Sequence, residues 1–235
     1  MSQPSVNYRQ IIAAEIFGTF SLIFAGTGAV VVNTVTGGTI THAGVAIVWG
    51  LIVMAMIYAI GHISGAHMNS AVTIGFCLAG RLKWSLAPVY LIAQAIGAFA
   101  ASAALLGIFG NHGNLGATLP AGSAMQSFAL EFILTFILMY VVLLVSTGPK
   151  ETGILAGIAI GGIIGLEAMF AGPICGASMN PIRSLAPALV SGNTNALWVY
   201  LSAPVLGAAL AVIIWKFIHP APSVSIPSTS TGELP

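Results

Sequence analysis

The stretches GAHMNSAVT (residues 65–73) and GASMNPIRS (residues 176–184) nearly repeat one another within a very apolar chain. In each, Gly-Ala and one polar residue precede Met-Asn, and the two asparagines, Asn69 and Asn180, lie 180 − 69 = 111 residues apart. A polar motif that recurs in the two halves of an apolar chain indicates an internal structural repeat.

The composition predicts a protein that crosses a membrane several times. Of the 235 residues, 57% are hydrophobic and 5% are charged, and the mean hydropathy is +1.02. The first eight residues lack the basic segment of a secretory signal, so we expect the apolar run from Ile11 to remain in the protein. A span needs about 20 mainly apolar residues, and six stretches qualify: about 11–33, 41–61, 84–108, 125–146, 153–172 and 196–218.

These stretches fill most of the chain and leave no room for a soluble domain. We expect an N-terminal tail (1–8), one membrane domain (9–218) and a disordered tail rich in Pro, Ser and Thr (219–235). The net charge of +1 offers no basic arm for nucleic acid. The two cysteines, Cys77 and Cys175, are interpreted as small buried apolar residues.

Two further apolar pieces are too short to cross a membrane. They are NSAVTIGFCLAG (69–80) and NPIRSLAPALVSG (180–192). Their length predicts re-entrant half-helices. Such pieces occur only where their backbone is buried in protein or lines a water-filled cavity, so a cavity is implied.

The two halves should enter the membrane with opposite topology. AEIFGTF (14–20) resembles LEFILTF (130–136), and the offset between their glutamates, Glu15 and Glu131, is 131 − 15 = 116. We therefore expect repeats at about 9–108 and 125–218. Each half contains three spans, an odd number, which makes the repeat inverted.

The basic residues predict the orientation. With both termini in the cytoplasm, five of the six fall near the cytoplasmic side, as the positive-inside rule requires: Arg9, Arg81, Lys83, Lys150 and Lys216. The exception is Arg183, three residues after Asn180. An ionisable residue at membrane depth is a functional candidate.

The duplicated asparagines suit the start of each half-helix. Asparagine is a good N-cap, and the helix end behind it carries a positive partial charge. Two such ends meeting near the midplane would repel a cation and donate hydrogen bonds to a neutral hydroxyl oxygen. The small residues before each asparagine should turn backbone carbonyls toward the lumen at Gly65, Ala66, His67, Gly176, Ala177 and Ser178.

With these motifs, SGAHMNSAVTIG and GASMNPIRSLAPAL, the chain resembles the aquaporin family, the major intrinsic proteins. The resemblance covers residues 9 to about 218. It implies an hourglass pore in each protomer of a homotetramer in the plasma (inner) membrane, which passively conducts water or small neutral solutes and excludes ions and protons. It implies no cofactor and no metal, and it makes Glu15 and Glu131 buried acceptors for loop N–H groups.

The chain departs from the family's paired Asn-Pro-Ala motifs. The first is Asn69-Ser70-Ala71 and the second is Asn180-Pro181-Ile182. Serine still supports a helix start, although it lacks the preset φ of proline. We expect Ile182, which replaces a small residue near the pore centre, to shift the half-helices or alter the local width.

The resemblance also places a second constriction. By spacing from the motifs, its four positions are Trp49, Ala168, Ala177 and Arg183. They predict a wide, amphipathic slot with the indole face opposite the two alanine side chains and the guanidinium. We expect the guanidinium to be held by backbone carbonyls of the second loop. The set resembles the glycerol-permeable and nodulin-26-like members, so glycerol and neutral metalloid hydroxides such as arsenous, boric or silicic acid are the expected solutes.

Two alternatives to this prediction stay open. One is a water-selective aquaporin. The other is a proton-coupled secondary transporter that uses Glu167. This carboxylate, beside Ala168, either points away from the lumen as a buried, hydrogen-bonded side chain or is a second polar group of the vestibule. An intramembrane enzyme is disfavoured, because the sequence has no Asp and no His/Glu cluster at metal-ligand spacing.

Overall fold

The structure, a computed structural model, describes residues 7–147 and 154–219. Its regular elements within these ranges are all helical. Six helices are long and apolar enough to cross a membrane. These are α1 (Tyr8–Val35), α2 (Thr41–Ser64), α4 (Ala87–Phe109), α5 (Ala124–Thr147), α7 (Ala156–Cys175) and α9 (Leu197–Ile218). The shorter elements are α3 (Ser70–Leu78), α8 (Pro181–Ser191) and the 3-10 turns η1 (Trp84–Leu86) and η2 (Gly113–Gly116).

The fold class and the six spans predicted from the sequence are confirmed, with differences at the helix ends. The second and fifth spans each continue three residues beyond the predicted end, to Ser64 and Cys175. Glycines stop them: Gly65 and Gly176 follow directly and have φ values of 83° and 85°. A left-handed glycine ends a helix because it has no Cβ to clash, so local backbone chemistry rather than hydropathy sets these boundaries.

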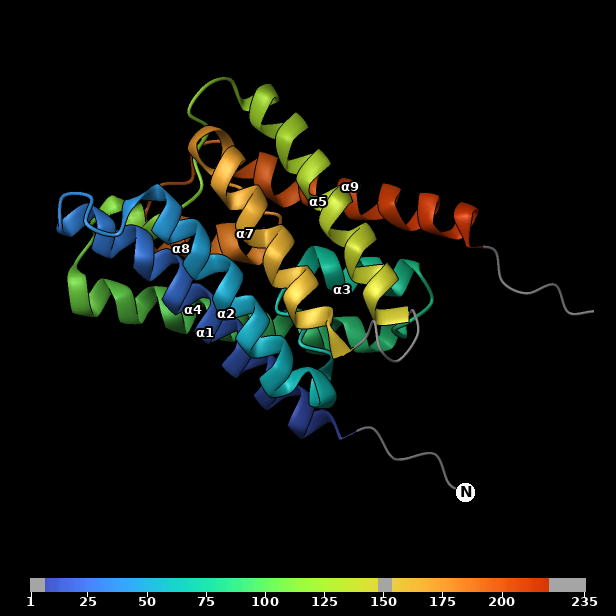
Figure 1. Ribbon diagram of the computed structural model, residues 1–235. Coiled ribbons are helices and arrows are strands. Elements are labelled where there is room, and N and C mark those ends of the chain that lie inside the picture. The colour runs from blue at the N-terminus through green and yellow to red at the C-terminus, as the bar shows by residue number, and fades with distance from the viewer. Residues whose placement is uncertain (1–6, 148–153, 220–235) are drawn as a thin grey trace, which may run out of the picture.

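The two halves of the chain are interlocked. Figure 1 shows α3 and α8 lying between the long helices, and the first turn of α1 and the last turn of α9 lie toward one end of the bundle, which we call the terminal end. Each short helix packs on a long helix of the other half, α3 on α9 and α8 on α4. Each short helix also packs on a long helix of its own half, α3 on α4 and α8 on α9, so both halves together enclose the short helices.

Glycines bring the long helices close together. At Gly97 on α4 and Gly207 on α9, an added Cβ would collide with a backbone carbonyl of α1 and of α5, respectively. Gly50 on α2 meets Gly161 on α7 in the same way. Close backbone approach at small residues is a common way to pack helices in a membrane, where lipid is as apolar as the side chains.

Some predictions fall on residues outside the described ranges. They concern most of the N-terminal tail (1–6), Lys150 and the C-terminal tail (220–235). Both cysteines lie within the described part of the chain, and both are buried and free.

Candidate functional site: two cavities and their constriction

Two cavities lie in the interior of the bundle. The larger, of about 760 Å³, runs from Tyr58, His62 and Ser146 at the terminal end past both asparagines. The smaller, of about 290 Å³, lies on the other side and reaches Asn33 and His42. Both cavities share three lining residues: Trp49, Ala168 and Arg183. These three residues therefore mark a constriction between the cavities.

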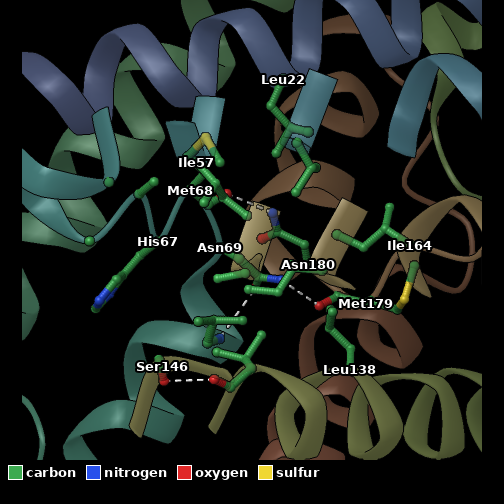
Figure 2. Close-up of a pocket in the computed structure, with 18 of the residues that line it drawn as sticks. Leu22, Ile57, His67, Met68, Asn69, Leu138, Ser146, Ile164, Met179 and Asn180 are labelled. Atoms are coloured by element: carbon green, nitrogen blue, oxygen red, sulfur yellow. Dashed lines mark hydrogen bonds between the residues drawn. The ribbon is translucent and has the colours of Figure 1, made fainter. Parts of the chain in front are cut away.

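The two asparagines meet at the centre of the larger cavity (Figure 2). Asn69 caps α3 with its Oδ1, which accepts from the N–H groups of Ala71 and Val72, and Asn180 Oδ1 accepts from the N–H of Ile182 at the start of α8. An asparagine cap of this kind satisfies backbone donors that have no partner within the helix.

Each asparagine also binds the opposite loop. Asn69 Nδ2 donates to the Met179 carbonyl, and Asn180 Nδ2 donates to the Met68 carbonyl, both at 2.9 Å. These are the dashed contacts at the centre of Figure 2. Because a primary amide carries two N–H groups, each asparagine keeps one that no described protein acceptor takes up.

Ser70 adds a contact that proline could not make. Its backbone N–H donates to Asn180 Oδ1 at 3.3 Å. Proline has no N–H, so Pro181 has no equivalent donor toward Asn69. The link between the two half-helices is therefore asymmetric, with three hydrogen bonds in total.

Two fully buried carboxylates hold the loops that precede the asparagines. Glu15 accepts from the N–H groups of His67 and Met68 at 2.9 and 2.8 Å. Glu131 does the same for the loop of the second half, with Ser178 and Met179 at 2.7 and 2.8 Å. The side chains of Ser64 and Gln94 also donate to Glu15. Each loop thus has its N–H groups turned away from the lumen.

The loop backbones follow the same left-handed pattern. Residues 65, 66 and 68 have positive φ values, as do residues 176, 177 and 179. Among the described residues, no protein donor contacts the carbonyl oxygens of the six loop positions for which lumen-facing carbonyls were predicted. All six positions line a cavity: Gly65, Ala66, His67, Ala177 and Ser178 the larger one, and Gly176 the smaller one.

At the constriction, Arg183 is stacked on Trp49. The guanidinium carbon lies over the indole, 4.6 Å from the ring centroid. Its Nη1 donates to the Gly116 carbonyl at 2.7 Å, and the side chain is only 4% exposed. Ala168 and Ala177 are similarly buried beside the cavity.

This arrangement differs from the sequence prediction in two ways. The acceptor for Arg183 belongs to η2, between α4 and α5, and not to the loop that precedes α8. The indole and the guanidinium also lie against one another rather than on opposite sides of a slot. A cation–π contact at this distance leaves no space for a solute between them, so a solute has to pass beside the pair.

Ile182 takes no part in lining the described cavities. Its side chain is 7% exposed and belongs to the apolar core between the helices. The expectation that it alters the width of the pore is therefore not supported by its position. A side chain in the first turn of α8 points away from the neighbouring Arg183, because residues one apart do not share a helix face.

Glu167 also faces away from both cavities. It is 1% exposed, and neither carboxyl oxygen has a hydrogen-bond partner within the described part of the chain. Of the two interpretations left open by the sequence, the structure favours the buried side chain over one in the vestibule, but the hydrogen bonds expected for the buried carboxyl group are not found among the described residues.

The segment that contains η2 was not identified from the sequence. Besides the Gly116 carbonyl, it supplies Thr118, whose hydroxyl donates to Ser184 on α8. Ser184 in turn is bonded to Ser178. The three glycines of the run GNHGNLG (110–116) were the available signal in the sequence. In the structure, Asn114 and Leu115 of this run also have positive φ values, as a tightly folded loop requires.

Comparisons with known proteins agree with this geometry. A family model described as Major intrinsic protein matches residues 1–215. Aquaporin NIP1-3 of Oryza sativa subsp. japonica is 50% identical over 216 residues, which cover 92% of this chain and 76% of the rice protein. Nodulin-26 of Glycine max is 45% identical over 219 residues, which cover 93% of this chain and 81% of the soybean protein.

A solved structure, the aquaglyceroporin from Plasmodium falciparum, superposes with a TM-score of 0.80 at 28% identity and covers 91% of this chain and 98% of its own. The inverted pair of half-helices, the paired asparagine caps and these similarities agree with one another. The chain belongs to the major intrinsic protein family, as a multi-pass membrane channel of the nodulin-26-like aquaporin group.

Proposed function

We propose that the channel passively conducts small neutral solutes with several hydroxyl groups, together with water, and excludes ions and protons. The solutes are glycerol and the metalloid hydroxides arsenous, boric and silicic acid. The observation that carries the proposal is the constriction, in which the stacked pair of Trp49 and Arg183 lies with the small side chains of Ala168 and Ala177.

Such a constriction offers two kinds of surface to a passing polyol. The indole and the alanine methyl groups contact carbon, while guanidinium N–H groups donate to hydroxyl oxygens. One of the five guanidinium N–H groups is used by Gly116. A side chain larger than alanine at position 168 or 177 would remove the space beside the stacked pair.

The same residues oppose cations. The guanidinium repels them at the constriction, and the N-termini of α3 and α8 add positive potential at the centre. The free N–H groups of Asn69 and Asn180 orient a water molecule by its oxygen, which interrupts a chain of proton-conducting waters. Hydroxyl groups of the solute donate to the loop carbonyls, while Glu15 and Glu131 keep the loops in position.

We also propose a homotetramer in the plasma (inner) membrane with cytoplasmic termini. Large apolar side chains are exposed along the long helices, including Ile92, Ile108 and Ile213, as expected for surfaces that meet lipid or other protomers. Basic residues gather at the terminal end, where Lys216 donates to the Leu78 carbonyl. The positive-inside rule assigns this end to the cytoplasm.

Purified protein in proteoliposomes tests the proposal. Light scattering after a glycerol gradient is expected to show protein-dependent glycerol entry, and water permeability is measured on the same vesicles. Fast water flux without any glycerol or metalloid hydroxide flux would assign the water-selective alternative. Accumulation of solute against its gradient, driven by a proton gradient, would assign a proton-coupled transporter, for which Glu167 is the candidate carboxyl group.

A further inference from the structure

We propose that Gly26 on α1 is a specificity-determining residue, because it sets how far the Trp49 indole withdraws from the constriction. This inference rests on the function proposed above. A Cβ at position 26 would lie 2.5 Å from Trp49 Cδ2 and closer still to Cζ3 and Cη2. The indole therefore packs directly against the backbone of α1.

The contact involves the face of the ring rather than its edge. The three atoms belong to the six-membered ring, and Cδ2 and Cη2 are opposite corners of it. A point close to both must lie over the ring. Arg183 lies over the same indole at 4.6 Å from its centroid. Since the backbone at Gly26 covers one face, the guanidinium takes the other, and the indole is held between them.

The internal repeat gives an independent argument. The offsets of 116 and 111 residues relate Gly26 to Val142 (26 + 116) and Trp49 to Ile160 (49 + 111). Both of these residues also line the larger cavity. In the second half, the smaller Ile160 takes the place of Trp49, and the larger Val142 takes the place of Gly26. Between the two halves, the sizes of the two related positions therefore change in opposite directions.

A methyl group at position 26 would have to displace the indole. Carbon atoms in contact prefer a separation of about 3.5 to 4.0 Å, so the ring has to move by roughly 1 Å. The indole ring is rigid, and the backbone of α1 prevents it from moving away from the constriction. The ring can therefore move only toward Arg183 and into the space beside Ala168. The constriction becomes narrower without any change in the residues that line it.

The experiment compares Gly26→Ala with wild type in proteoliposomes, using water, glycerol and a larger polyol. We expect the ratio of glycerol to water permeability to fall about tenfold, which corresponds to about 1.4 kcal/mol in the barrier. The matched control is Gly28→Ala, two residues along α1. There an added Cβ would meet only the flexible end of Leu105 at 3.3 Å, so the ratio should not change.

The same substitution in a Trp49→Ala background separates this mechanism from a general distortion of α1. Without the indole there is nothing for the methyl group to displace, so Gly26→Ala should have no further effect on the ratio. An equal fall in both backgrounds overturns the proposal, as does an unchanged ratio in folded Gly26→Ala.

Two other outcomes are also decisive. If Gly26→Ala alone does not assemble, recovery of folded protein in the double variant supports a direct clash with Trp49, and failure of both variants overturns it. If wild type conducts water only, the proposed solute class fails. In that case the role of Gly26 is tested by water permeability. Gly26→Ala should lower the water permeability of the wild-type channel but should not change it when Trp49→Ala is also present.

Discussion

Replacing Arg183 with Val should make the channel leak cations and protons while neutral solutes still pass. The guanidinium carbon lies 4.6 Å from the Trp49 ring centroid, and a cation that passes beside this pair approaches the charge at a similar distance. With an effective dielectric constant of about 20, two unit charges at this separation repel by roughly 3 to 4 kcal/mol. Each 1.4 kcal/mol is a factor of ten, so the leak should rise by about 10² to 10³.

The leak is measured with a pH-sensitive dye and by conductance, in vesicles matched for protein amount. Arg183→Lys is the control, because it keeps the positive charge although it loses the planar fork that stacks and binds Gly116. We expect the Lys variant to stay far tighter to ions than the Val variant. If folded Arg183→Val remains tight to ions and ranks water, glycerol and metalloid hydroxides as wild type does, the charge is not the barrier.

Three further substitutions test the central region. Ser70→Pro loses the hydrogen bond to Asn180 but suits a first helical position. We therefore expect an unchanged ranking of solute permeabilities and a change in the free energy of unfolding of at most about 1 kcal/mol, measured by thermal melting in detergent. An altered ranking would contradict this expectation. Ile182→Ala should destabilise by about 2 to 5 kcal/mol through a core cavity without raising flux of larger solutes, whereas a rise would place the side chain in the pore. Glu167→Gln should keep passive glycerol flux with or without a proton gradient, and loss of flux in the folded variant would assign the carboxyl a role in transport.

The sequence predicted those features that follow from local chemistry. Six apolar stretches gave six long helices, and the half-helices begin one residue after Asn69 and Asn180, as expected for N-caps. The resemblance to the family, rather than local chemistry, selected Trp49, Ala168 and Arg183, which the structure brings together where the two cavities meet.

Features that depend on side-chain direction or on distant segments were not predicted. The acceptor for Arg183 lies 67 residues away, at Gly116, and no local pattern relates the two positions. The stacking of the guanidinium on Trp49 and the burial of Ile182 depend on how each helix is rotated about its axis. Rotation is set by packing against other helices, which hydropathy and spacing do not specify.

The hydrogen bonds that join the two half-helices also affect how the protein is made. The partners of Asn69 and Ser70 lie 110 residues further along the chain. At about 5 to 20 residues per second, the ribosome takes roughly 6 to 22 s to synthesise the 111 residues from Asn69 to Asn180. In a chain truncated before residue 124, Ser70→Cys in a Cys77→Ala background should therefore react with membrane-impermeant thiol reagents. During biogenesis the first re-entrant loop therefore lacks these hydrogen-bond partners until the second half has been synthesised, so the two loops complete their mutual contacts in one late step.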